Sequence, residues 1–230
     1  MNKKKVLIIS GCIMAIIVII LLVINIRNHK KFKLDSIYDV LPKEVRLLYA
    51  NTVNVSCGGD LVLDIKIDGG KININEISND NLLNYVFSYM DKNGLLKNNI
   101  KKGDFNKIVN KLFDSRIDLY KTDSKFQYGD YEYMFDSNKI SRKSSKCEID
   151  TKTVSYLYGY SIGNKGLFMD VLIGTLKDDK LYDYKDELIG LYNGNKNKLP
   201  DLLNKASYYR YYYQKYGDEY KLDSVEWISK

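Results

Sequence analysis

The stretch YYRYYYQKYGDEYKLDSVEWI, residues 208–228, decides the fold because it has the pattern of an antiparallel β-hairpin. Tyrosine, valine, tryptophan and isoleucine, which favour strands, occur in its two halves. Gly217 and Asp218 stand between the halves and are residues that tight turns prefer. We therefore predict a final pair of strands, Ser207–Lys215 and Tyr220–Ile228.

The second of these strands keeps one apolar face only if it contains a bulge. Tyr220 and Leu222 share one parity, whereas Val225 and Trp227 share the other. Successive side chains of a strand point to opposite faces, so one extra residue must be inserted between the two pairs. We predict this bulge at Asp223-Ser224, where it brings all four side chains to the same face.

Further strands are predicted upstream from alternating or continuous apolar residues. These strands are Tyr131–Phe135, Val154–Tyr160 and Leu167–Leu176, the last reached through a turn at Gly163–Gly166. Tyr128-Gly129-Asp130 interrupts a tyrosine-rich stretch in the same way as Tyr216-Gly217-Asp218 does, so we expect two equivalent turns. An earlier hairpin is predicted over Leu61–Asn75, with strands around a turn at Asp68-Gly69-Gly70.

Two amphipathic helices precede most of these strands. Ser78 is the expected cap of a helix whose apolar face runs from Leu82 to Met90 and which ends near Gly94. Asp104 is the expected cap of a second helix, with apolar residues from Phe105 to Phe113 at helical spacing. Shorter helices are predicted from Pro42 through Tyr49 and over Pro200–Ala206. The predicted fold class is α+β, with two main helices and a largely antiparallel, tyrosine-rich sheet.

The N-terminal segment has the features of a membrane anchor. Residues 6–26 read VLIISGCIMAIIVIILLVINI and include no charged side chain. About 20 apolar residues in a helix cross a hydrocarbon core of roughly 30 Å. We predict a cytoplasmic tail at 1–5, a transmembrane helix at 6–26, a juxtamembrane stalk at 27–43 and an extracytoplasmic α+β domain at 44–230.

Two other interpretations of this segment stay open. A cleaved signal peptide would explain the basic start Met-Asn-Lys-Lys-Lys, although the apolar stretch is longer than usual and no small-x-small site follows Ile26. Ile9-Ser10-Gly11-Cys12 resembles a bacterial lipobox, but the apolar run continues for 14 residues beyond Cys12. Basic residues flank both ends, so orientation rests on the very short N-terminal tail, which places the body outside.

The positive charge of the chain is concentrated around the predicted anchor. The chain has 36 basic and 29 acidic residues, a net charge of +7, and six of the basic residues lie within the first 31 positions. No acidic residue occurs before Asp35, so the remaining 30 basic side chains nearly balance the 29 acidic ones. Nucleic-acid binding needs a basic surface that a nearly neutral domain lacks. We therefore expect no nucleic-acid partner.

The only cysteines outside the predicted anchor are Cys57 and Cys147. An extracytoplasmic compartment would permit a disulfide between them, closing a loop of about 90 residues and contributing roughly 4 kcal/mol in the chain-entropy model. Two separate buried thiols are the alternative. Two cysteines without a nearby histidine do not make a structural zinc site, so we expect no metal there.

The most familiar catalytic sites are excluded by composition. The one histidine, His29, lies at the end of the predicted anchor, which removes Ser-His-Asp, Cys-His and HExxH chemistry from the body. The chain contains neither GxxxxGK[ST] nor GxGxxG, and we expect no cofactor. Asp91-Lys92-Asn93-Gly94 resembles part of a calcium loop, but a helix stop is the better interpretation. One acidic cluster leaves carboxylate catalysis open, and its members are Asp178, Asp179, Asp183, Asp186 and Glu187.

The 21 tyrosines are the most unusual feature of the composition. Their rings offer rigid apolar area with a polar tip, which suits stacking on sugar rings or contact with a protein partner. The candidate binding surface consists of Tyr209, Tyr211, Tyr213 and Trp227. The alternative is that the tyrosines pack across strands within an antiparallel sheet.

The anchor, the helices DNLLNYVFSYM and DFNKIVNKLF, and the closing hairpin together resemble uncharacterised membrane-anchored extracytoplasmic proteins of low-GC Gram-positive bacteria. The resemblance covers much of residues 78–230 as a pattern of elements, and it supplies no residue roles. Two helices before a curved antiparallel sheet also resemble cystatin/NTF2-like folds, from which the early hairpin departs.

Together these features predict a non-enzymatic binding or envelope-interaction module. Its expected partners are the lipid bilayer and an envelope protein or glycan. A carboxylate-dependent hydrolase acting on envelope glycans is the alternative. The two differ in whether a pair of acidic side chains converges in a cleft at the spacing that glycosidases use.

Overall fold

The computed structural model describes residues 41–52, 70–114, 116–146, 152–183, 185–205 and 208–228. The predicted transmembrane helix at 6–26, the first strand of the predicted early hairpin, and both Cys57 and Cys147 lie outside these residues. Within the described ranges, no helix is long and apolar enough to span a bilayer.

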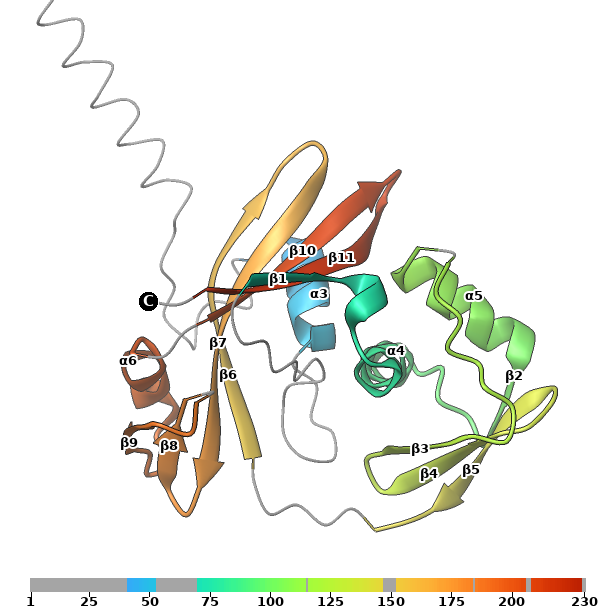
Figure 1. Cartoon of the computed structure of the whole chain (residues 1–230), viewed down its shortest axis with the longest axis horizontal. Coiled ribbons are helices and arrows are strands. Elements are labelled where there is room, and N and C mark those ends of the chain that lie inside the picture. The colour runs from blue at the N-terminus through green and yellow to red at the C-terminus, as the bar shows by residue number, and fades with distance from the viewer. Residues whose placement is uncertain are drawn as a thin grey trace, which may run out of the picture.

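The described part of the chain is α+β, as predicted, with antiparallel pairing throughout (Figure 1). Its helices are α3 (Lys43–Thr52), α4 (Asn79–Lys92), α5 (Lys102–Leu112) and α6 (Leu199–Leu203), with short 3-10 turns η1 (Ile74–Glu76) and η2 (Lys196–Lys198). Its strands are β1 (Gly70–Asn73), β2 (Asn99–Lys101), β3 (Lys125–Tyr128), β4 (Tyr131–Phe135), β5 (Lys139–Ser144), β6 (Lys152–Ile162), β7 (Gly166–Lys177), β8 (Lys180–Tyr182), β9 (Leu188–Leu191), β10 (Tyr208–Tyr216) and β11 (Glu219–Ile228).

These strands form two sheets, whereas the sequence predicted one. The larger, seven-stranded sheet has the order β1-β11-β10-β7-β8-β9, and β6 pairs with the other edge of β7. The smaller, four-stranded sheet has the order β2-β5-β4-β3. Figure 1 shows α4 between the two sheets, with α3 beside β10 and β11. The split follows from α4, because its two sides each need a partner layer.

The two sides of α4 present large aromatic side chains to different layers. Phe87 is fully buried against the smaller sheet, with its ring centroid 4.5 Å from that of Tyr133 and 5.0 Å from that of Phe126. Tyr85, two residues earlier, interacts with Asn51 of α3 and Tyr213 of β10. Residues two apart on a helix point in nearly opposite directions, so α4 fills both halves of the core.

The predicted ends of α4 are confirmed by local geometry. The side chain of Ser78 accepts a hydrogen bond from the backbone N–H of Asn81 at 3.3 Å, which is the expected N-cap contact. Gly94 follows the helix with φ of 66°, a left-handed conformation that glycine adopts without steric cost. The segment Asp91–Gly94 is therefore a helix stop, as predicted. Helix α5 begins at Lys102, two residues before the predicted cap Asp104.

The closing hairpin has the predicted bulge. Tyr213 pairs with Leu222 and Tyr212 pairs with Ser224, so Asp223 is the extra residue on β11. Pairing on either side of it places Tyr220, Leu222, Val225 and Trp227 opposite Lys215, Tyr213, Tyr211 and Tyr209. All eight side chains therefore share one face of the hairpin, which confirms the prediction made from parity.

The two Tyr-Gly-Asp segments form equivalent turns, as predicted. Tyr128 pairs with Tyr131 and Tyr216 pairs with Glu219, so a Gly-Asp pair is the whole loop in both hairpins. Gly129 has φ of 55° and Gly217 has φ of 60°. The first loop position of this hairpin type needs a positive φ, which explains the glycine there.

The second half of the predicted early hairpin is only partly correct. β1 is a strand that pairs with β11, with Ile72 opposite Val225, and it ends at Asn73, two residues before the predicted end. The other strand of the predicted hairpin lies outside the described residues, so its pairing with β1 stays a prediction. Ile74 and Asn75 belong instead to η1, where the Glu76 carboxylate accepts a hydrogen bond from the backbone N–H of Asn73 at 2.7 Å. This local capping contact competes with strand extension and turns the chain toward α4.

Candidate functional site

The tyrosines predicted to form a binding surface lie in the core instead. Tyr209, Tyr211 and Tyr213 are 3%, 0% and 2% exposed, so these three side chains cannot form an exposed surface. Trp227 lies opposite Tyr209 on the same side of the hairpin and is partly buried. On this face Tyr213 contacts Thr52 of α3 and Tyr85 of α4, which places it in the core.

The contact with α3 is polar as well as apolar. The hydroxyls of Tyr213 and Thr52 are 3.1 Å apart, and the Ser88 hydroxyl of α4 donates a hydrogen bond to the Asn51 carbonyl at 2.7 Å. Burial raises the pKa of the Tyr213 phenol well above its ordinary value. This phenol therefore stays protonated in the interior and acts as a structural hydrogen-bonding group.

The opposite face of β10 is the one that solvent reaches. It carries Tyr208, Arg210 and Tyr212, which are all partly buried. Register places Arg210 opposite Asp170 of β7 and Tyr212 opposite Phe168. The sequence itself indicates which face of β10 is exposed to solvent. Arg210 and Gln214 lie on this face, and a charged or amide side chain favours solvent.

An ion pair lies at the centre of this face. Arg210 donates to both carboxylate oxygens of Asp170, from Nε at 2.6 Å and from Nη2 at 2.9 Å. Asp170 is 3% exposed, so its charge is neutralised almost entirely by this bidentate contact. The Asp170 carboxylate in turn raises the pKa of the Arg210 guanidinium above its ordinary value. Both groups are fully engaged, which makes the pair a structural feature of the sheet.

Aromatic rings surround the ion pair. The Arg210 guanidinium lies 4.3 Å from the ring centroid of Phe168, and the Phe168 and Tyr212 centroids are 6.2 Å apart. Tyr212 donates its hydroxyl to Glu226 at 2.6 Å, and Lys71 lies 4.3 Å above its ring. Burial raises the pKa of the Tyr212 phenol, and the hydrogen bond to Glu226 raises it further. These contacts fix both rings in place without covering the whole face.

An open hollow of about 430 Å³ lies at one end of this face. Its aromatic wall is formed by Phe168 and Tyr212, and its polar side chains are Ser161, Lys165, Gln214 and Asp223. Gly166 lies at its base, where a Cβ atom would overlap the carbonyl oxygen of Tyr213. Only glycine allows β7 and β10 to approach this closely at the hollow.

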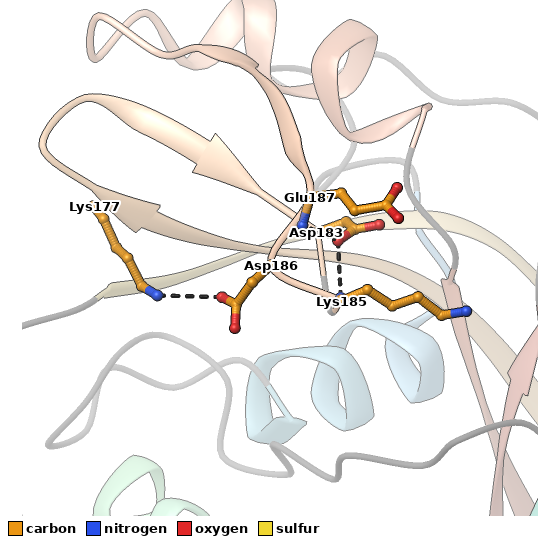
Figure 2. A network of polar contacts seen from close by, with 5 residues as sticks. All are labelled: Lys177, Asp183, Lys185, Asp186 and Glu187. Atoms are coloured by element: carbon orange, nitrogen blue, oxygen red, sulfur yellow. Dashed lines mark hydrogen bonds and ion pairs between the residues drawn. The ribbon is translucent and has the colours of Figure 1, made fainter.

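The acidic cluster that could have supported catalysis forms or stabilises turns. Its members Asp183, Asp186 and Glu187 lie in the loop between β8 and β9 (Figure 2). One carboxylate oxygen of Asp183 accepts hydrogen bonds from the backbone N–H groups of Lys185 and Glu187, both at 2.8 Å. Asp186 forms an ion pair with Lys177 at 3.2 Å. Asp178 and Asp179 both have positive φ and form the tight turn between β7 and β8. None of the five acidic residues lines the hollow of the exposed face.

The described residues contain no group of three or more histidine, cysteine, aspartate or glutamate side chains that could hold a metal ion. The residues that line the 430 Å³ hollow provide hydrogen-bond donors, hydrogen-bond acceptors and aromatic rings, which are the groups typical of a binding site.

Comparison with known proteins finds no match to this chain among protein-family models, curated proteins or solved structures.

Proposed function

We propose that the chain is a single-pass, membrane-anchored extracytoplasmic protein that binds a component of the cell envelope without catalysis. The apolar segment at 6–26 supports the anchor. The observation that carries the binding role is the open hollow on the larger sheet, with its aromatic wall and polar rim.

Hydrolysis is the alternative function, and the contacts on the exposed face favour binding over it. Asp170 is held by Arg210, and Glu226 accepts the hydroxyl of Tyr212. Asp223 is the only carboxylate among the residues that line the 430 Å³ hollow. A glycosidase of the usual type needs two carboxyl groups flanking the scissile bond, one of them free to transfer a proton.

The binding role is tested with full-length protein in detergent micelles and purified, membrane-free cell-wall material from a low-GC Gram-positive bacterium. We expect the wild-type protein to sediment with the wall and the double variant Phe168→Ala/Tyr212→Ala to bind at least tenfold more weakly. Two aromatic contacts of about 1 kcal/mol or more each, from partly buried rings, account for that loss. The measurement is the fraction bound as a function of protein concentration.

A matched control separates this effect from a general loss of exposed apolar area. Tyr131 and Met134 lie on the smaller sheet and are 38% and 39% exposed. Tyr131→Ala/Met134→Ala should bind as tightly as wild type. Equal weakening by both double variants, or no binding of the wild-type protein to the wall, contradicts the proposed role.

The orientation has its own test. Protease added to intact cells whose wall has been removed should digest the body, residues 32–230, while a cytoplasmic control protein survives. The reason is that a body outside the membrane is accessible without permeabilisation. Digestion of the body only after the membrane has been permeabilised would show that the orientation is the reverse.

A further inference from the structure

The hollow on the exposed face continues into a second one. A hollow of about 230 Å³ lies beside the first and shares Gln214 and Asp223 with it. Its other polar or charged side chains are Asn73, Asn75, Asp114, Arg116, Tyr216 and Lys221. The two hollows therefore adjoin at Gln214 and Asp223, and we call them together the hairpin groove.

The β-bulge places Asp223 at the junction of the two hollows. Asp223 is the unpaired residue of the β10–β11 ladder, and its side chain is exposed. One of its carboxylate oxygens, Oδ2, accepts a hydrogen bond from the Ser224 hydroxyl at 2.8 Å, which orients the group. Bulges commonly redirect a side chain near a functional site, and here the redirected side chain is an acceptor in the groove.

Gln214 supplies the complementary donor at the same junction. The Tyr216 hydroxyl donates to Gln214 Oε1 at 3.0 Å, and the amide nitrogen Nε2 of the same side chain is a hydrogen-bond donor. A carboxylate acceptor and an amide donor side by side match a ligand group with one N–H and one C=O. A secondary amide, such as the acetamido substituent of an amino sugar, has this pair.

The charges of the hairpin groove favour a neutral ligand. Arg116 is paired with Asp114 at 2.9 Å, and the Lys221 ammonium donates to the Asn110 carbonyl at 2.6 Å. The other charged side chains are Lys165 and Asp223, so the groove has three basic side chains, Lys165, Arg116 and Lys221, against two acidic ones, Asp114 and Asp223. The resulting net charge of +1 is too small an excess to select a polyanion. Phe168 and Tyr212 add flat apolar area, which suits the C–H face of a sugar ring.

We infer that the hairpin groove binds a neutral oligosaccharide of N-acetylated amino sugars, at least two sugar units long. One ring lies against Phe168 and Tyr212, and the chain crosses Asp223 and Gln214 into the second hollow. This inference rests on the proposed binding role and adds the ligand class and the direction in which the ligand lies.

The test uses full-length protein in detergent micelles and isothermal titration with N-acetylglucosamine and its β-1,4-linked dimer, tetramer and hexamer. We expect affinity to rise at least tenfold from monomer to tetramer and then to level off, because the second hollow is occupied only by a longer ligand. Phe168→Ala should weaken binding of every length. Asp223→Asn, which keeps the size of the side chain, should remove most of the gain with length.

Asp218→Ala is the matched control for Asp223, because it removes an acidic residue of the same hairpin that lines neither hollow of the groove. It should bind all four sugars as wild type does. Thermal unfolding of each variant, followed by circular dichroism, shows whether the fold is intact. The Asp223→Ala variant repeats the test without the carboxamide group that Asp223→Asn introduces.

The outcomes distinguish this inference from the proposed function. Equal affinity for monomer and tetramer, with loss on Phe168→Ala, overturns the extended groove and leaves the binding surface standing. No sugar binding, while cell-wall material still binds through Phe168 and Tyr212, overturns the ligand class alone and points to another wall polymer or a protein. No binding to sugars or to the wall overturns both proposals.

Discussion

Replacing Phe87 with alanine is expected to lower the free energy of unfolding by about 3–5 kcal/mol, the usual loss for a fully buried phenylalanine. Phe87 is 0% exposed and fills the space between α4 and the smaller sheet. Its ring centroid lies between 4.5 and 6.4 Å from those of Phe105, Phe126, Tyr128, Tyr133 and Phe135. Removing the ring leaves a cavity that these rigid aromatic neighbours cannot close.

The measurement is thermal unfolding followed by near-ultraviolet circular dichroism, which reports on the packing of the surrounding tyrosines. Met134→Ala is the control, because Met134 lies on the solvent face of the same sheet. We expect it to change stability by less than about 0.5 kcal/mol. Phe87→Leu should give an intermediate loss. A Phe87→Ala protein as stable as wild type would show that α4 is not packed on the smaller sheet as described.

Replacing Arg210 with methionine is the second change with a large expected effect, again about 3–5 kcal/mol. Methionine retains much of the apolar stem of arginine but removes both hydrogen bonds to Asp170. Asp170 is almost fully buried, so its carboxylate would be left without a counter-charge in the sheet. The penalty is therefore the desolvation of an unpaired charge.

A double-mutant cycle separates this penalty from lost packing. Asp170→Leu/Arg210→Met removes both charges and should be more stable than Arg210→Met alone. Lys107→Met is the control, since Lys107 forms an exposed ion pair with Asp104. This substitution should change the free energy of unfolding by less than about 1 kcal/mol. If the double variant is as unstable as Arg210→Met, the buried charge is not the cause.

Local patterns in the sequence predict the elements of this fold well. The cap at Ser78, the helix end near Gly94, the turn at Gly217-Asp218 and the bulge at Asp223-Ser224 are each predicted from residues close together in the chain. Each of these features depends on short-range sterics or hydrogen bonding, which residue type alone specifies. The short strands β2, β8 and β9 have too few residues for a periodic pattern, and they were not predicted.

The arrangement of these elements was harder to predict. β10 carries tyrosine at both parities, so hydrophobicity alone does not identify its buried face, and the predicted binding surface includes three tyrosines that are buried. The polar residues of the strand contain the missing signal, because Arg210 and Gln214 both lie on the exposed side. The division into two sheets depends on which sides of α4 are covered, and this involves contacts between residues far apart in sequence.

The candidate site was predicted only in part. Asp223 was predicted as a bulge residue, but its position between two hollows depends on β7, β1 and the segment after α5. No local pattern brings Lys165, Gln214 and Arg116 to the same groove. The membrane anchor and the Cys57–Cys147 bridge concern residues outside the described ranges, and both stay predictions.

The extra residue in β11 changes which positions of that strand face the core. Before Asp223 the core-facing positions are even-numbered, as at Leu222, and after it they are odd-numbered, as at Val225. Loss of Asp223 alone would restore regular alternation, because Leu222 would stay opposite Tyr213 and Ser224 opposite Tyr212. Leu222 and Val225 would therefore still face the core. What the extra residue adds to the strand is an acidic side chain directed at the hairpin groove.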